Sequence, residues 1–542
     1  MATPLDWIQD VNSSLRFLMG VALMFILVPT LAMTMPGGIA DLNLWASTEP
    51  IGSRAGPTAV ASGDVTPGIG GISDRLGASD PFSPGPESES QVGAADRETT
   101  STIASQESTT SDAEAGSAED GSKTSSDGLP ASTTQPPTES TGNGSDARGS
   151  GTITGDACPC TVTGIVELKG NISLQGDLMV MGGTLVARPG VNVEGNGHQI
   201  MFMDGGTADF QGTEVFTWSG NGSNANLTRD ITFSNLRRIM FHNGAGPSIL
   251  KYFIVANSGT GALGDYSLHW HLNGDSARGT IVQGVVVINS ANHAFVPHGS
   301  HGITFKDTIA KNGRCDAYWW DPPEFQSTST VNNSNDIVYD HALADGVTNC
   351  IGDSRGFRLS AFNLGAGRGN IIRNSVARNV KPSSPKDCSG FHWPELHHDQ
   401  PSSWTFTNNA SFNSLCNGIF VWQNDSQTHT INGFKGDGID HGAYVNTYDY
   451  RNINVDFVEV HALSWSVTGG SIGVVKVFRH ALRADPVVFS DVTIDRFIIN
   501  NADDGGHVPG TYVLSNTGLA CADIEYVSVV PGTVVRIDGI DC

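Results

Sequence analysis

The sequence predicts an all-β protein whose main domain is a parallel β-solenoid. Five nine-residue segments align without gaps and recur every 23 to 34 residues. Apolar and polar residues alternate within each segment, which is the pattern of a short strand with one buried face. Each segment ends in Asn or Asp, residues that favour turns. Because one such unit cannot bury a core alone, the units are expected to stack as successive coils.

The aligned segments share an apolar column near the start and an amide or carboxylate column at the end. They are IVQGVVVIN (281–289), TFKDTIAKN (304–312), IVYDHALAD (337–345), IIRNSVARN (371–379) and TFTNNASFN (405–413). The apolar column is Val282, Phe305, Val338, Ile372 and Phe406, and the terminal column is Asn289, Asn312, Asp345, Asn379 and Asn413. We interpret the terminal column as a ladder of turn residues that bond from coil to coil. Few stretches have helical periodicity, so little helix is expected.

The N-terminal part of the chain differs from the repeats in composition. Residues 17–35 carry no charge and are long enough to span a bilayer, which predicts a transmembrane signal anchor behind a cytosolic tail of residues 1–16. A cleaved signal peptide and a secreted product are the alternative. Residues 36–155 are rich in Ser, Thr, Gly and acidic residues, and this segment is expected to form a disordered stalk.

The part beyond the stalk is acidic and contains all eight cysteines. Residues 47–155 hold 16 acidic and 5 basic residues, and a net charge of −12 remains for residues 156–542. This balance argues against nucleic acid as a partner. The cysteines permit disulfides in an oxidising compartment, and Cys521 with Cys542 is expected to close the C-terminal end. Sequons at six positions fit a glycosylated ectodomain: Asn171, Asn221, Asn226, Asn332, Asn409 and Asn424.

Histidines gather in the stretch YSLHWHLNGD (266–275) and in the coil that follows it. His269 and His271 are two residues apart, so on a strand they point to the same side. Counting back from the apolar column places His293 of the next coil at a similar level. We therefore predict that His269, His271 and His293 lie on one wall and form a candidate zinc site. The alternative is that these histidines are structural.

Further polar and aromatic residues near this cluster are candidates for catalysis or substrate binding. PHGSHG (297–302) presents His298 or His301 on a tight turn, and CDAYWWDPPEF (315–325) combines acids with tryptophans. Tryptophans can bind sugar rings, and acids beside them can transfer protons. The segment 387–400 adds His392, which could extend the same wall. Together these features favour a long groove and a polymeric substrate.

The same stretches resemble the cell-surface hyaluronidase family typified by transmembrane protein 2 and the cell-migration-inducing hyaluronan-binding protein. The family motifs matched are YSLHWHLNGD, NHAFVPHGSHGITFKDTIAKNGRCDAYWWD (292–321), RDITFSNLRRIMFHNG (229–244) and GRGNIIRNSVARN (367–379). Residues 156–225 look like the glycine-rich G8 region that precedes the family's β-helix, which would then occupy residues 226–542. The resemblance implies a right-handed, single-stranded parallel β-helix of the pectin-lyase type, with calcium involved in depolymerisation of hyaluronan or a related glycan at the cell surface.

One departure from the family pattern concerns the motif GHC, which is GRC here, so that Arg314 stands where the family has a histidine. An arginine can bind a uronate carboxylate with two hydrogen bonds, but it does not donate a proton at neutral pH. The chain is therefore interpreted either as a polysaccharide-degrading enzyme or as a non-catalytic glycan-binding surface protein.

The candidate site residues are assigned as follows. The catalytic candidates are His271, Asp275, His298, Asp316 and Asp321; the substrate-binding candidates are Arg278, Arg314, Trp319, Trp320 and His392. In a hydrolase the carboxylates would act as acid or base, whereas in a lyase a histidine would remove the C5 proton of a uronate. The sequence does not separate these two reactions.

Overall fold

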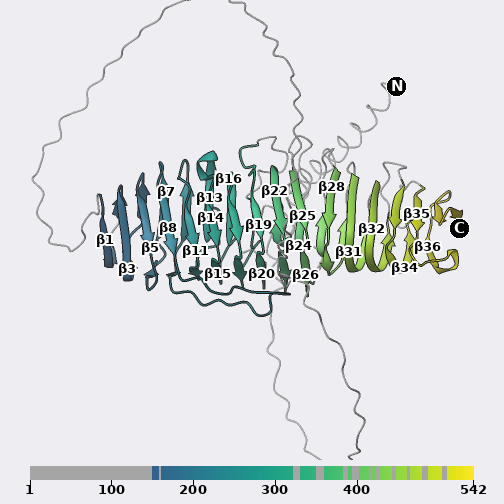
Figure 1. The fold of residues 1–542 in the computed structure, drawn as a ribbon, viewed down its shortest axis with the longest axis horizontal. Helices are drawn as coiled ribbons and strands as arrows, with labels where there is room; N and C mark the ends of the chain where they lie inside the picture. Colours follow the sequence, from purple (N-terminus) through teal and green to yellow (C-terminus); the bar gives the residue numbers. More distant parts are fainter. Residues whose placement is uncertain are drawn as a thin grey trace, which may run out of the picture. The chain divides into compact units, whose positions relative to one another are not determined.

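The computed structural model describes residues 149–157, 160–320, 330–349, 359–381, 388–393, 402–415, 417–421, 428–441, 447–460, 464–478, 486–502 and 509–542. They all lie in one unit of the chain, Ser79–Cys542. The described residues contain no α-helix, as expected, and short strands stack into parallel coils along one axis (Figure 1). The predicted anchor and residues 36–148 of the predicted stalk fall outside these ranges. Within them, no helix has the length and apolarity needed to cross a bilayer.

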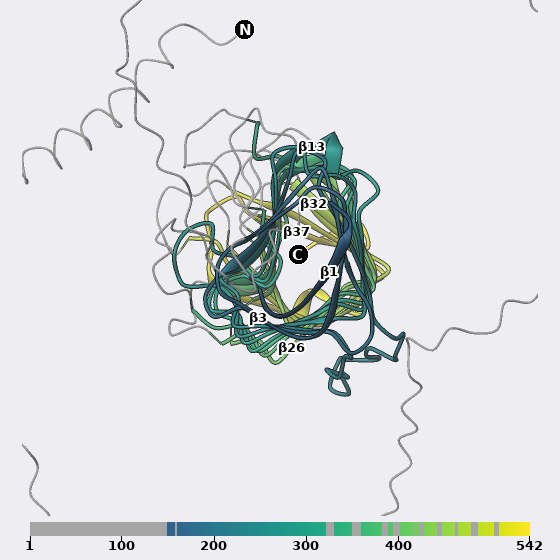
Figure 2. The same ribbon diagram turned by 90° about the vertical axis from the view of Figure 1, so that its left-hand side faces the viewer.

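Three walls enclose the interior of the coils. Seen end on, successive coils superimpose, with β13 and β26 on opposite sides (Figure 2). The first wall contains β2 (Cys160–Val162), β4 (Leu178–Met181), β7 (Gln199–Met203), β10 (Arg238–His242), β13 (Leu268–Gly274), β16 (Phe295–Ser300), β21 (Leu359–Asn363), β24 (Cys388–Trp393), β27 (Asn417–Val421) and β30 (Ile439–His441). Tyr318 bridges β16 to β21 through Phe295 and Phe362.

The other two walls begin together in β1 (Gly151–Ala157) and β3 (Ile165–Leu174). The second wall continues with β5 (Thr184–Ala187), β8 (Thr207–Gln211), β11 (Ile249–Lys251), β14 (Ile281–Gln283), β17 (Thr304–Lys306), β19 (Val338–Asp340), β22 (Gly367–Arg373), β25 (Ser402–Thr407) and β28 (Thr428–Asn432). The third wall continues with β6 (Asn192–Glu194), β9 (Thr232–Ser234), β12 (Ile254–Ala256), β15 (Val286–Ile288), β18 (Ile309–Lys311), β20 (Leu343–Asp345), β23 (Val376–Arg378), β26 (Ala410–Phe412) and β29 (Lys435–Gly436).

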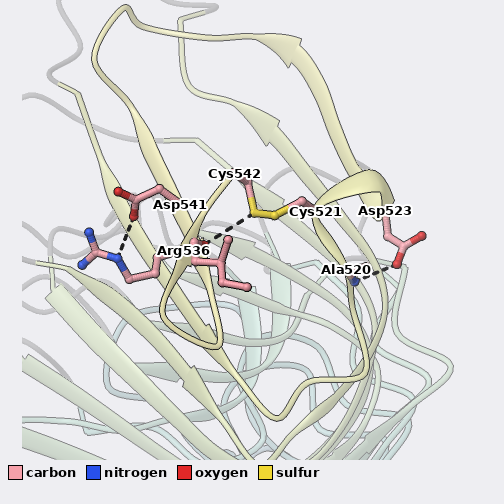
Figure 3. The surroundings of a disulfide bond; sticks show 7 residues. Ala520, Cys521, Asp523, Arg536, Asp541 and Cys542 are labelled. Atoms are coloured by element: carbon pink, nitrogen blue, oxygen red, sulfur yellow. Dashed lines mark hydrogen bonds and ion pairs between the residues drawn. A yellow bond between two sulfur atoms is a disulfide. The ribbon is translucent and has the colours of Figure 1, made fainter.

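The C-terminal coils have longer strands. β28, β29 and β30 all pair with β31 (Thr447–Val460), which pairs with β32 (Ser464–Val477). The remaining strands are β33 (Val487–Ser490), β34 (Thr493–Asn500), β35 (Thr511–Ser515), β36 (Ile524–Ser528), β37 (Val534–Ile537) and β38 (Ile540–Asp541). A disulfide joins Cys521, in a 3-10 turn, to the last residue, Cys542, as the sequence predicted (Figure 3). This bridge and the Arg536–Asp541 ion pair tie down the chain end.

Stacked aromatic rings fill the interior behind the first wall. Phe202, Phe241 and Trp270 follow one another on β7, β10 and β13, with ring centroids 4.6 and 5.2 Å apart and nearly parallel planes. Tyr318 continues a neighbouring column between Phe295 and Phe362, at 4.9 and 4.5 Å. Each ring therefore packs on its counterpart in the next coil, which fixes the register of the strands that carry it.

The predicted turn ladder is present. Asn257, Asn289, Asn312, Asn379 and Asn413 all have φ between 52° and 56°, a left-handed conformation that Asn tolerates better than most residues. Their side chains bond along the axis: the Asn289 amide donates to Asn257 Oδ1 at 3.1 Å, and the Asn379 amide donates to Asp345 Oδ1 at 2.6 Å. These residues are structural, as predicted.

The gapless alignment is wrong by one residue in the coil of residues 337–345. Phe305 pairs with Tyr339 rather than Val338, and Ile309 pairs with Leu343 rather than Ala342. His341, with φ of 56°, occupies the turn position that the alignment gave to Asp340. In this coil Gly346, with φ of 83°, takes the terminal turn position, and the His341 ring stacks on Trp218 with centroids 3.7 Å apart.

A segment that the repeat did not predict, residues 213–228, leaves the coils and crosses the outer face of the third wall (Figure 1). We call it the strap. Trp218 packs in an apolar cluster with outward side chains of five successive coils: Val286, Ile309, Leu343, Val376 and Ala410. Its indole nitrogen donates to His341 O, and Arg378 donates to Asn221 O at 3.0 Å.

The predicted end of the stalk at residue 155 is also wrong. Gly151–Ala157 form β1, which pairs in parallel with β3. Composition suggested a stalk because the segment GTITGD has a single large apolar residue, Ile153, which is buried. Backbone pairing with the first complete coil orders the rest.

The aromatic column behind β13 gives a stability prediction. Trp270 is fully buried, and its replacement by Ala should lower the free energy of unfolding by about 3–5 kcal/mol because stacking and burial are lost together. Chemical denaturation measures this difference. The control is Val527→Ala, at a side chain that is 67% exposed, where the change should stay below about 0.5 kcal/mol.

Candidate functional site

Three histidines form a column on the outer face of the first wall. Strand register aligns His242 of β10 with His271 of β13, and His271 with His298 of β16. Their neighbours Phe241 and Trp270 point inward, so alternation along the strand turns the imidazoles outward. Ring centroids are 4.9 Å apart for His242 and His271, and 4.7 Å apart for His271 and His298.

The pair His242 and His271 shares a hydrogen bond. Their Nδ1 atoms are 3.0 Å apart, so one Nδ1 must carry a proton and donate it to the other. Partial burial, followed by the charge of Arg238, lowers the pKa of His242, which favours its neutral form. The pair can therefore hold a proton on a half-buried surface and pass it on.

His269 lies two residues before His271 on the same face of β13 and is 1% exposed. Its ring is 5.2 Å from that of His271 and 5.9 Å from that of His298. Its Nδ1 is 3.3 Å from Gly264 O and donates to it, which leaves the lone pair on Nε2. In the described part of the chain that Nε2 has no hydrogen-bond partner. Burial, together with the charges of His271 and His298, holds the pKa of His269 well below its usual value.

The predicted grouping of His293 with His269 and His271 is wrong. Residue 293 precedes β16, and its ring stacks on Trp319 with centroids 3.7 Å apart. Tyr266 packs between the two groups, with its ring 4.7 Å from His269 and 5.3 Å from His293. His298, not His293, is the partner of His271 in the next coil.

Asp316 belongs to a separate buried network. Its carboxylate accepts hydrogen bonds from the backbone and hydroxyl of Ser360, at 2.5 and 3.3 Å, and from Asn363 at 3.3 Å. Trp320 Nε1 donates to the same asparagine at 3.1 Å. Burial raises the pKa of Asp316 to about 6, against the opposing effects of His293 and these hydrogen bonds. The network ties the segment before residue 321 to β21.

Asp275 and Arg278, predicted as catalyst and substrate ligand, bind each other instead. Arg278 donates to Asp275 Oδ1 at 2.9 Å and to Asp336 Oδ2 at 2.8 Å. The hydrogen bond from Arg278 lowers the pKa of Asp275. Asp275 is therefore ionised at neutral pH and poorly suited to act as a general acid.

The remaining predicted ligands are spread over different environments. Trp319 and Trp320 are 2% and 3% exposed and pack with Tyr266, Val296 and Ala366, so they offer no open platform for a sugar. His392 is buried on β24 with its ring 5.3 Å from Phe420, whereas Arg314 is exposed. Asp321 lies outside the described residues.

A cavity of about 590 Å³ opens next to the histidine column. Two of its lining residues, Leu272 and Gly299, directly follow His271 and His298 in the chain. The cavity therefore lies at the carboxyl ends of β13 and β16. A ligand in it would be close to the imidazoles of His271, which is partly exposed, and of His298, which is 6% exposed.

Sequence reasoning missed His242. The signal was present, because RIMFH (238–242) and LHWH (268–271) both carry an apolar residue, an aromatic and a final histidine at matching positions. Aligning the coil before YSLHWHLNGD would have placed His242 beside His271.

The residues as placed do not form a metal site. Within the described ranges, no group of three or more His, Cys, Asp or Glu side chains could hold an ion. Imidazoles are also poor ligands for calcium, which takes oxygen atoms.

The lowered pKa values predict how stability depends on pH. An imidazole whose folded-state pKa lies below 6.5 binds its proton more readily in the unfolded chain, so stability is lost as pH falls below about 6.5. Asp316 acts in the opposite sense: its raised pKa costs stability as pH rises from 3.8 towards 6. Asp316 is present in both the parent and a His269→Asn variant. The difference between the pH dependence of stability of the two proteins therefore reports on His269.

We expect the melting temperature of His269→Asn to fall less between pH 7 and pH 5 than that of the parent, because a charge no longer has to be buried. Thermal unfolding at several pH values measures this, with His198→Asn as a control outside the cluster. Equal slopes for parent and His269→Asn would contradict the assignment.

The part of the chain that carries the histidine column matches a known protein family. Residues 238–321 match the model of the family described as CEMIP beta-helix. The match begins at β10 and includes His242, His269, His271 and His298; it does not extend to the G8-like region predicted for residues 156–225. No curated protein and no solved structure matches the chain. This match and the parallel β-helix support the resemblance to the CEMIP family that the motifs indicated.

Proposed function

We propose that this protein degrades an extracellular polysaccharide, hyaluronan or a related glycan. The observation that carries the proposal is the column His242, His271 and His298 on the outer face of the CEMIP-type β-helix, beside a cavity large enough for a sugar ring. A stack of parallel coils offers a long surface on which a polymer can lie across several turns. The column supplies proton-transfer groups at one point on that surface.

Among the described residues, the groups available favour elimination over hydrolysis. Hydrolysis of a glycosidic bond commonly needs a carboxylic acid and a carboxylate, whereas Asp275 is paired with Arg278 and Asp316 is buried in its own network. A neutral imidazole can remove the C5 proton of a uronate. The electron pair then forms the C4–C5 double bond, the C4–O bond breaks, and the leaving oxygen takes a proton from water, whose hydroxide is neutralised by the protonated imidazole. We assign the proton removal to His271, with His242 as its hydrogen-bond partner.

An extracellular location also belongs to this proposal. Cys160, Cys315, Cys388, Cys521 and Cys542 are disulfide-bonded, which fits an oxidising compartment. The membrane anchor or secretion signal expected in residues 17–35 would deliver the domain there. One expected glycosylation site is structural instead: Asn409 is fully buried and donates to Ile372 O at 3.0 Å.

The first test is a substrate panel. The ectodomain should shorten at least one of hyaluronan, chondroitin and a pectin-like polymer, measured by size-exclusion chromatography with and without added calcium or zinc. Replacing His271 by Ala should reduce the rate by about 100-fold or more, because the proton acceptor is lost. His198→Ala, at a histidine outside the column, should keep the parental rate.

If the folded parent cuts no polymer under any of these conditions, the protein is a glycan-binding surface protein. If His271→Ala folds and keeps the full rate, the assignment of the site is wrong.

The second test concerns the reaction class. Elimination creates an unsaturated uronide that absorbs ultraviolet light, so absorbance should rise as chains shorten. Chain shortening with no rise in absorbance would show hydrolysis and would exclude His271 as a C5 base.

A further inference from the structure

The cavity beside the histidine column has a lining that suits an anion. Its described lining residues include Leu272, His301, Val331, Asn333, Asn335 and Arg368. They include one arginine, one histidine and two asparagines, and none of these described residues bears a carboxylate. Leu272 and Val331 add apolar surface of the kind that covers the flat face of a sugar ring.

Arg368 is the arginine that lines the cavity, and its side-chain N–H donors are unoccupied among the described residues. Among the described residues, its guanidinium makes no hydrogen bond and no ion pair, although it lines the cavity. Arg278, the residue that the sequence suggested for a uronate, is already bound to two carboxylates. Because Asp275 and Asp336 are held by Arg278, their charges are partly offset near the cavity.

Asn335 positions the two cationic or donor groups together. Its Oδ1 accepts the Arg368 backbone N–H at 2.9 Å, and its own backbone N–H donates to His301 Nδ1 at 3.2 Å. Since His301 Nδ1 is an acceptor, the neutral ring carries its proton on Nε2, which lies 3.5 Å from Asn335 Nδ2. One asparagine thus links β22, which carries Arg368, to the turn that carries His301.

The backbone at Gly299 lets the lining close around a small ligand. Gly299 has φ of 55°, and a Cβ there would lie 2.4 Å from Val331 O and 2.7 Å from Leu272 Cδ2. Only glycine permits this close approach. The cavity is therefore shaped by packing at the position directly after His298.

We propose that this cavity is a subsite for the carboxylate of an acidic sugar, bound by the Arg368 guanidinium with support from His301. An arginine binds a carboxylate with two parallel hydrogen bonds. The formal charge of the chain is −25, so long-range attraction cannot gather an acidic polymer and recognition has to be local. The inference rests on the proposed function for its polysaccharide and specifies an acidic one, with Arg368 as a specificity-determining residue.

The test measures binding separately from cleavage. Calorimetry in a His271→Ala background, which conserves the ligand, compares a hyaluronan tetrasaccharide with its carboxyl-reduced counterpart. The acidic ligand should bind more tightly, and Arg368→Gln should weaken it by about tenfold to a hundredfold while leaving the reduced ligand unchanged. Arg373→Gln, on the same strand but paired with Asp340, is the matched control and should bind as the parent does.

Equal affinity of the two ligands, or an Arg368→Gln variant that binds the acidic ligand as tightly as its parent, would overturn the subsite. Acid-selective binding that depends on Arg368 would support it even if the substrate panel showed no cleavage, an outcome that counts against the proposed function alone. Cleavage of an acidic polymer, together with unchanged binding in Arg368→Gln, would support the proposed function and count against the subsite alone.

Discussion

Register between parallel coils is the constraint on which the rest of the molecule depends. Each strand lies about 4.8 Å from its counterpart in the next coil, so residues at equal positions meet side by side. Inside the coils this brings Phe202, Phe241 and Trp270 into one stack. Because inward and outward side chains alternate along each strand, the same register also stacks the outward residues that follow these rings in the sequence. The imidazole column is thus the outer counterpart of the aromatic core.

Burial and pairing then separate the titratable groups by role. Burial lowers the pKa of His242 and of His269, which favours their neutral forms, while the hydrogen bond from Arg278 lowers the pKa of the exposed carboxylate of Asp275. Asp316 retains its proton to higher pH than usual because it is buried. Among the described residues, the carboxylates nearest the cavity are therefore paired with Arg278 or buried, which leaves the histidine column as the proton-transfer group beside it.

Much of the fold could be predicted from the sequence because the repeat is local. Alternation within nine residues and a terminal Asn are sufficient to predict strands, corners and the turn ladder. The site was less predictable because it depends on connection lengths. His271 lies 11 residues before Val282, whereas His298 lies only seven before Phe305. The 3-10 turn Asp275–Ala277 and the irregular pairing after His271 account for the longer connection. Counting at constant length therefore selected His293. The burial of Trp319 and Trp320 was equally hidden, since it depends on Tyr266 and Ala366 from other coils.

The strap changes how the solenoid can lose structure. In a stack of repeats each coil normally contacts only its neighbours, so the ends can open one coil at a time. The apolar cluster that contains Trp218 includes side chains from β15 to β26, and the hydrogen bond from Trp218 to His341 joins residues 123 positions apart. Opening any one of these coils exposes part of a shared apolar cluster. The middle of the solenoid is thereby coupled into a single cooperative block, and the candidate site lies on the opposite wall of those same coils.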